Sequence, residues 1–183
     1  LNTLYIWSDL EGSTLEEAKL KLNQLDNRFD NLKKIQNVFL HCYFNSKDTD
    51  LLFNKLISNE KTDFSRYNYF YARHLDNKGQ KVEARKIINK GLKKYPRNLI
   101  LNQYKVNFYL QINFSDFNCS NKVDILAELL YIAANALSSQ SYFQTSNFYL
   151  NFSKYLNKNF FSFDTLLAEN FYNIEDLENS KKT

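Results

Sequence analysis

The sequence predicts an all-α fold built from helix–turn–helix hairpins, and three observations predict it. The 183 residues include only three glycines and one proline, far fewer than a β-protein with many turns needs. Apolar residues recur at helical spacing along most of the chain. Small and packing residues also recur about 34 residues apart, which indicates a helical repeat. These features favour a stacked array of hairpins, and an irregular helical bundle is the alternative.

The first repeat is expected to span about residues 1–32 and to lack the start of its first helix. Residues 15–27 have the pattern of its second helix, and Trp7 lies near the end of the first. Thr14 and Glu17 stand three residues apart, the spacing of a capping box that begins a helix. The sequence therefore predicts a helix that begins directly after Thr14.

The clearest hairpin spans residues 65–98. Apolar residues follow a helical period on both sides of Gly79, which marks the turn. Pro96 ends the second helix, and the side chain of Asn98 can cap the helix that follows. Small residues stand where helices must approach closely, and these residues are Ala72, Ala84 and Gly91. The sequence predicts two packed helices joined by a tight turn.

The same positions return further along the chain. Ala134 is followed by Ala168, and Ser146 by Ser180, each after one full repeat period. The interval from Val106 to Ala134 is shorter than this period, so one repeat is shortened. The expected repeats are about 1–32, 33–64, 65–98, a shortened 99–126, 127–160 and a truncated 161–183. Together they are expected to form a single domain that belongs to a longer protein.

The shortened repeat has no room for a complete second helix. Residues 114–122 read FSDFNCSNK, and their Ser, Asp and Asn side chains favour turns over helix interiors. We therefore expect a loop or a single helical turn over this segment.

The hairpin 65–98 resembles a tetratricopeptide repeat at its small positions, its turn glycine and its closing proline. It departs from the family's pattern at Asn68 and Tyr71, where Trp and Leu are usual. The order of the later repeats resembles multi-repeat tetratricopeptide proteins of alphaproteobacteria. The resemblance implies a right-handed α-solenoid in which the first helices of successive repeats line a concave face.

That resemblance also implies a non-enzymatic scaffold that binds an extended peptide or protein segment. Asn and Gln side chains can hold the backbone of such a segment, and tyrosines can bury its side chains. Tyr69, Arg73 and Tyr131 are the expected anchors, and a solvated polar face is the alternative. The residues expected on the concave face are Lys34, Asn37, His41, Tyr69, Arg73, Gln103, Asn107, Tyr131, Asn135 and Tyr172.

The sequence contains no motif for catalysis. Its glycines stand at positions 12, 79 and 91, so they form no phosphate-binding loop. A GxSxG nucleophile elbow is also absent from the sequence. We expect no catalytic residue and no cofactor, so the chain is expected not to be an enzyme. The binding domain of a larger enzyme is kept as an alternative.

The cysteines and histidines are few. Cys42 and Cys119 belong to no CxxC pair and are expected to be two ordinary thiols, which favours a reducing compartment such as the cytoplasm. His41 and His74 are the only histidines, and His41 and Cys42 are adjacent, so one helix cannot turn both toward one ion. We therefore expect no metal site.

The charge distribution argues against nucleic acid as the partner. The net charge of +4 is spread along the chain and makes no continuous phosphate track. Ala84 and Arg85 form a pair similar to that of half-a-TPR repeats in RNA-processing scaffolds, so an RNA scaffold stays open as an alternative. No run of about 18 uncharged apolar residues occurs, and no transmembrane segment is expected.

Overall fold

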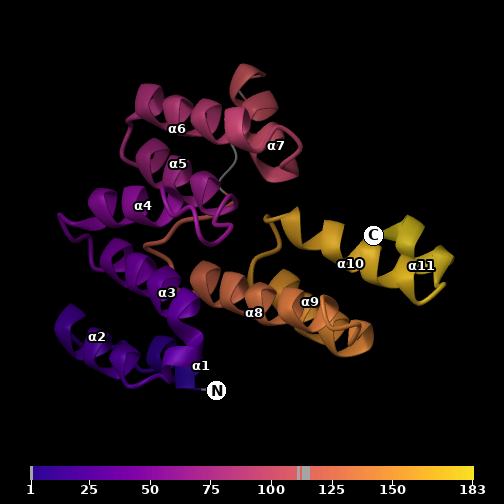
Figure 1. Cartoon of the computed structure of the whole chain (residues 1–183), viewed down its shortest axis with the longest axis horizontal. Coiled ribbons are helices and arrows are strands. Elements are labelled where there is room, and N and C mark those ends of the chain that lie inside the picture. The colour runs from indigo at the N-terminus through magenta and orange to yellow at the C-terminus, as the bar shows by residue number, and fades with distance from the viewer. Residues whose placement is uncertain (1, 111, 113–115) are drawn as a thin grey trace. The chain divides into compact units, whose positions relative to one another are not determined.

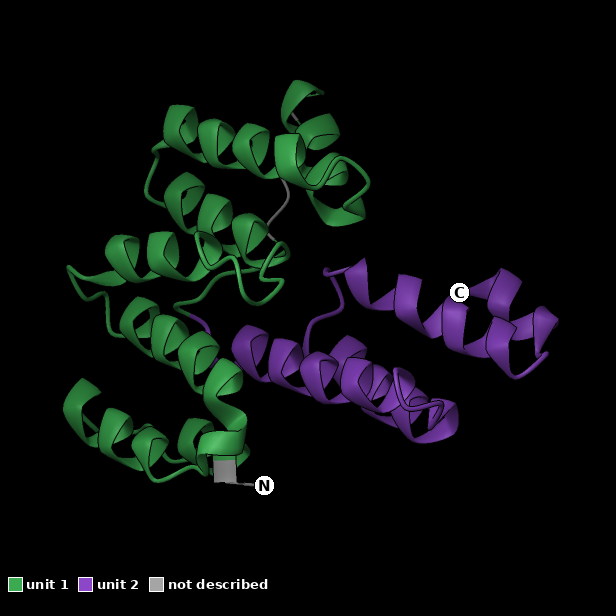
Figure 2. Ribbon diagram, in the orientation of Figure 1, with its two compact units in different colours: residues 1–120 green, residues 121–183 purple. Residues whose placement is uncertain are grey.

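The computed structural model describes residues 2–110, 112 and 116–183 (Figure 1). Every regular element among these residues is a helix, which confirms the predicted all-α class. None of the described helices is both long enough and apolar enough to cross a membrane. The chain divides into two compact units, residues 1–120 and residues 121–183, coloured separately in Figure 2.

Unit 1 is a series of short antiparallel helices, each packed on the next (Figure 1). A single 3-10 turn, η1 (Asn27–Phe29), precedes α3. The helices are α1 (Asn2–Ser8), α2 (Leu15–Asn23), α3 (Asp30–Tyr43), α4 (Thr49–Ile57), α5 (Tyr67–Asn77), α6 (Lys81–Lys94) and α7 (Leu99–Tyr109). Between Tyr109 and Lys122 none of the residues that the structure describes is helical, and residues 116–121 are loop and turn. The loop prediction for residues 114–122 is thus confirmed over residues 116–121, whereas Lys122 already begins the next helix. Residues 114 and 115 lie outside the described part.

Unit 2 contains two further hairpins. Its helices are α8 (Lys122–Ser138), α9 (Phe143–Leu156), α10 (Ser162–Asn173) and α11 (Leu177–Lys182). Helix α9 packs against both α8 and α10, and α11 packs against α10. The extension of this pattern into one continuous solenoid over 1–183 stays a prediction.

The helix starts follow the capping signals of the sequence. The Glu17 amide donates to Thr14 Oγ1 (3.3 Å), and the Thr14 amide donates to Glu17 Oε2 (2.7 Å), which confirms the predicted capping box at α2. The Leu101 amide donates to Asn98 Oδ1 (3.2 Å), so Asn98 caps α7 as expected. These bonds satisfy amides that a helix start leaves without an intrahelical partner.

One turn geometry recurs through both units. Four of the five described residues with positive φ share it: Asn45 (50°), Gly79 (75°), Ser141 (65°) and Glu175 (62°). After each, the next amide bonds to the carbonyl five residues earlier: Ser46 to His41, Gln80 to Leu75, Tyr142 to Leu137 and Asp176 to Phe171, at 2.8–3.0 Å. This is the Schellman ending of a helix. The two turns within each unit are separated by the same period that the sequence shows.

The small residues lie where the hairpin pattern expects them. Ala72, Ala84 and Ala134 are completely buried. Ser146 Oγ donates to the Ala134 carbonyl (2.8 Å), and Ser180 Oγ forms the same bond to the Ala168 carbonyl (3.0 Å) one repeat later. Ala168 itself is only half-buried. The recurrence of Ala and Ser in the sequence thus corresponds to the same hydrogen bond formed in two successive repeats.

Gly91 is a sensitive packing position on α6. A Cβ atom added there lies 3.0 Å from Leu101 Cδ1 and 3.2 Å from Asn68 Cγ, so α5 and α7 both approach it closely. We expect Gly91→Leu to lower the free energy of unfolding by about 1–3 kcal/mol, because the added side chain overfills this contact. Urea denaturation followed by circular dichroism measures it. The control Lys90→Leu, on the exposed side of α6, is expected to change stability by less than about 0.5 kcal/mol. Equal losses would contradict close packing at Gly91.

Candidate functional site

Residues 116–119 fold back onto the helices of unit 1, and Phe117 enters their core. The Phe117 side chain is 2% exposed. Its ring centre lies 4.5 Å from that of Phe70 on α5 and 5.7 Å from that of Phe39 on α3. Phe39 and Phe70 are both completely buried and pack edge to face on each other. The loop after α7 is therefore part of the core of unit 1.

Asp116 is held on α5 by a buried polar network. The Tyr69 hydroxyl donates to the Asp116 carboxylate, and Arg73 Nε lies 3.0 Å from Asp116 Oδ1. The other side of the Arg73 guanidinium bonds to Asp76 Oδ2 at 3.0 Å. Burial raises the pKa of Asp116, although the Arg73 charge acts in the opposite direction. Burial and the nearby Asp116 charge raise the pKa of Tyr69 well above its usual value, so its hydroxyl stays a donor.

Cys119 lies beside Cys42, and the two residues form a disulfide. Their Cα atoms are 5.8 Å apart although 77 residues separate them in sequence. The expectation of two ordinary thiols is therefore wrong. The spacing of the cysteines concealed the pair, because it forms only when the loop after α7 returns to α3.

His74 completes a buried cluster with the two sulfur atoms. His74 Nδ1 lies 3.1 Å from Cys42 Sγ and 3.7 Å from Cys119 Sγ. On its other side, His74 Nε2 lies 3.1 Å from Asp50 Oδ1, and Lys78 Nζ lies 3.1 Å from Asp50 Oδ2. Burial lowers the pKa of His74, and Asp50 opposes this shift. The ligand-type atoms of Cys42, His74 and Cys119 all lie within 4.8 Å of one another, an arrangement that could hold a metal ion.

Three of the predicted concave-face residues offer no surface to a partner in this structure. Tyr69 and Arg73 are 2% and 6% exposed, and both bond to Asp116 of the chain's own loop. His41 is buried, its Nδ1 lies 3.0 Å from Ser46 Oγ, and burial lowers its pKa. In this structure Tyr69 and Arg73 hold residues 116–119, and their expected role as ligand anchors stays a prediction. The loop occupies the face on which they lie.

The remaining predicted residues are at least partly exposed. Gln103 and Asn107 lie on α7, where Gln103 Nε2 donates to Asn107 Oδ1 (2.8 Å). In unit 2, Tyr131 is half-buried with its ring 5.7 Å from Phe163, whereas Asn135 and Tyr172 are exposed. A binding role for these residues stays a prediction.

Lys34 and Asn37 line a surface cavity of about 170 Å³ between α3 and α4. Val38 and Leu56 are buried in its lining, and Lys34 and Lys55 are exposed beside them. Neither lysine has an ion-pair partner among the residues that the structure describes. The complete lining is Lys34, Asn37, Val38, Leu52, Lys55, Leu56 and Asn59. The residues that sequence reasoning missed, Lys55 and Asn59, belong to the second helix of the hairpin and the turn after it.

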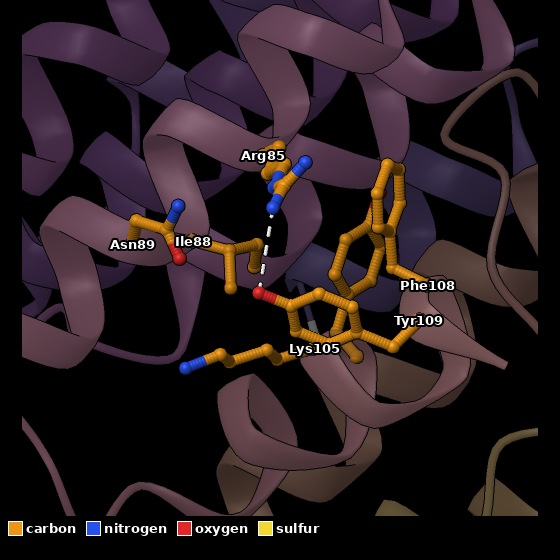
Figure 3. A pocket seen from close by; sticks show the side chains of 7 residues that line it. Arg85, Ile88, Asn89, Lys105, Phe108 and Tyr109 are labelled. Atoms are coloured by element: carbon orange, nitrogen blue, oxygen red, sulfur yellow. Dashed lines mark hydrogen bonds between the residues drawn. The ribbon is translucent and has the colours of Figure 1, made fainter.

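A second hollow lies between α6 and α7, and Figure 3 shows its side chains. The Arg85 guanidinium lies 5.4 Å from the ring centres of both Phe108 and Tyr109. It also donates to the Tyr109 hydroxyl at 3.4 Å, the dashed line in Figure 3. The hollow measures only about 10 Å³, about the space of one water molecule. The hollow is therefore a helix contact with room for no ligand larger than water.

No protein-family model, curated protein or solved structure matches this chain.

Proposed function

We propose that the chain is a non-enzymatic scaffold of helical hairpins that binds a protein segment carrying an acidic residue beside an apolar one. In this proposal the hairpins form a right-handed solenoid of the tetratricopeptide type. The Schellman turns at Asn45 and Gly79, repeated at Ser141 and Glu175, support a common hairpin unit. Stacked hairpins of this kind present long surfaces that suit extended partners.

The observation that carries the proposal is the cavity between α3 and α4. Its lining combines two exposed lysines with buried apolar side chains, Val38 and Leu56. An apolar side chain of the partner can fill about 170 Å³ and displace water from the lining. A neighbouring carboxylate can then pair with Lys34 or Lys55, and Asn37 and Asn59 can bond to its backbone.

The loop on α3 and α5 supports the same ligand chemistry. There the chain's own Asp116 and Phe117 are held side by side, the carboxylate by Arg73 and Tyr69 and the ring by buried phenylalanines. An acidic residue followed by an aromatic one is therefore a sequence that α3 and α5 accommodate. We take this internal segment as the nearest guide to the partner's composition.

Selection from a random peptide library on the immobilised chain tests the proposal. We expect the enriched peptides to share Asp or Glu next to Leu, Ile or Phe. Reversing both cavity charges with Lys34→Glu and Lys55→Glu should weaken a selected peptide about tenfold or more, because two attractive pairs become repulsive. Fluorescence anisotropy with a labelled peptide measures the dissociation constants.

The matched control is Lys86→Glu with Lys90→Glu on the exposed side of α6, which changes the net charge by the same amount. It should leave the affinity within about twofold, since these residues lie outside the cavity. Equal weakening by both pairs of substitutions would refute the cavity as the binding site. A chain that selects no acidic peptide but binds RNA with a steep salt dependence would favour the RNA-scaffold alternative.

A further inference from the structure

The cluster of Cys42, His74 and Cys119 contains more than a structural disulfide needs. A disulfide requires only its two cysteines, yet here a buried imidazole points one nitrogen at both sulfur atoms. We propose that, in the reduced protein, this cluster binds one Zn²⁺ ion through Cys42 Sγ, Cys119 Sγ and His74 Nδ1. Two thiolates and one imidazole form a donor set that zinc prefers, with a fourth position left for another ligand.

The distances from the histidine to the sulfur atoms suit a shared ion. In a tetrahedral site with Zn–N of about 2.05 Å and Zn–S of about 2.3 Å, a nitrogen and a sulfur ligand lie about 3.6 Å apart. The observed separations of His74 Nδ1, 3.1 Å from Cys42 Sγ and 3.7 Å from Cys119 Sγ, lie on either side of this value. The histidine therefore needs little movement to bind the ion, whereas the two bonded sulfur atoms must separate to about 3.8 Å once the disulfide is reduced.

Asp50 supplies the partner that a zinc-bound histidine usually has. A carboxylate on the second ring nitrogen fixes the ring orientation and makes the first nitrogen a stronger ligand. His74 Nε2 lies 3.1 Å from Asp50 Oδ1, so the proton of the ring is held on the side away from the sulfur atoms. A disulfide gives no reason for this arrangement.

The formal charges of the site also balance. The ion contributes +2 and the two thiolates −2, while Asp50 contributes −1 and Lys78, 3.1 Å from it, contributes +1. The sum is zero, which limits the cost of placing the ion among buried side chains. The ligands come from α3, α5 and the loop, so the ion would tie residues 116–119 to both helices.

The disulfide and the zinc site are alternative states of the same atoms. A dithiol reductant gives two electrons and two protons to the S–S bond, which yields two thiols and leaves the reductant as its own disulfide. Binding of Zn²⁺ then displaces the two thiol protons into water, because the metal ligand is the thiolate.

Metal titration of the reduced chain tests the proposal. The full chain is reduced with a dithiol under nitrogen, freed of reductant, and titrated with Co²⁺ as a visible substitute for Zn²⁺. We expect one Co²⁺ per chain, with thiolate-to-cobalt charge-transfer absorption and the strong visible bands of a tetrahedral site. Added Zn²⁺ should abolish both signals. A folded, reduced chain that takes up no Co²⁺ overturns the proposal.

Variants distinguish metal binding at the Cys42–His74–Cys119 cluster from nonspecific metal binding by free thiols. His74→Ala should weaken binding by at least a hundredfold, and Asp50→Asn by about 10–100-fold through the second nitrogen of the ring. His41→Ala is the matched control, because His41 is buried beside Cys42 but bonds to Ser46, and it should leave the affinity unchanged. Unchanged affinity in both His74→Ala and Asp50→Asn overturns the proposal.

If the reduced chain does not fold without metal, circular dichroism provides the test. Zn²⁺ should then restore the helical signal of the wild type, because an ion that binds only the folded chain stabilises the folded state. It should fail to restore the signal of His74→Ala at the same concentration. If Zn²⁺ restores neither chain, or restores both equally, the proposal is overturned.

Discussion

Replacement of Phe117 by alanine is expected to lower the free energy of unfolding of unit 1 by about 3–5 kcal/mol. The ring is 2% exposed and packs on Phe39 and Phe70, so its removal leaves a cavity between two helices and the loop. Relaxation cannot easily close this cavity, because the neighbouring rings are themselves completely buried. Urea denaturation followed by circular dichroism measures the loss.

Phe148→Ala is the matched control for this prediction. Phe148 on α9 is 59% exposed and has a close aromatic neighbour, Phe152, at 4.9 Å. We expect its loss to change stability by less than about 1 kcal/mol, since little apolar area is buried there. If Phe117→Ala proved as mild as Phe148→Ala, residues 116–119 would not be packed in the core of unit 1.

The features that the sequence predicted correctly depend on residues close together in the chain. The Thr14–Glu17 capping box, the Asn98 cap and the Gly79 turn each involve only a few consecutive residues. The helix class follows from spacing within single helices. Even the repeat period is a local property that recurs, since each Schellman turn is formed by its own short stretch of chain.

The docking of residues 116–119 could not be predicted in the same way. Its contacts join residues 47 positions apart (Tyr69 and Asp116) and 77 positions apart (Cys42 and Cys119). The polar residues of the segment predicted a loop correctly, but they did not show what the loop covers. One signal was present in the sequence, because the apolar residues Phe117 and Cys119 alternate with the polar residues Asp116 and Asn118. That alternation is typical of an extended segment packed on one side.

The sequence predicted only some of the residues that line the cavity between α3 and α4, because it does not show which part of a helix face stays open. The tetratricopeptide resemblance selected first-helix residues, and Lys34 and Asn37 do line the cavity on α3. Tyr69 and Arg73 were selected by the same rule, but the loop covers them. Lys55 was missed because the cavity extends onto α4, the second helix of its hairpin. Which part of a helix face remains open is a tertiary property that no repeat period contains.

Arg73→Met is expected to destabilise unit 1 by about 3–5 kcal/mol at neutral pH, because it leaves the Asp116 carboxylate buried without its cation. Methionine keeps most of the apolar length of the arginine side chain, so the packing of α5 changes little. Asp76, the other partner of Arg73, is more exposed, and water can replace the lost bond there. Most of the loss is therefore assigned to Asp116.

The pH dependence of this loss identifies its cause. Burial already raises the pKa of Asp116, and removal of Arg73 raises it further, since that charge acted to lower it. A carboxyl with a raised pKa in the folded state contributes stability below its unfolded pKa of about 3.9, and that stability is lost as the pH rises through the folded value. The free energy of unfolding that Arg73→Met loses relative to wild type should therefore become smaller from pH 7 toward pH 4. Adding Asp116→Asn should remove both the pH dependence and part of the deficit at pH 7. If the lost free energy of unfolding stayed constant over this pH range, and the double variant regained none of it, Arg73 would act through packing and not through Asp116.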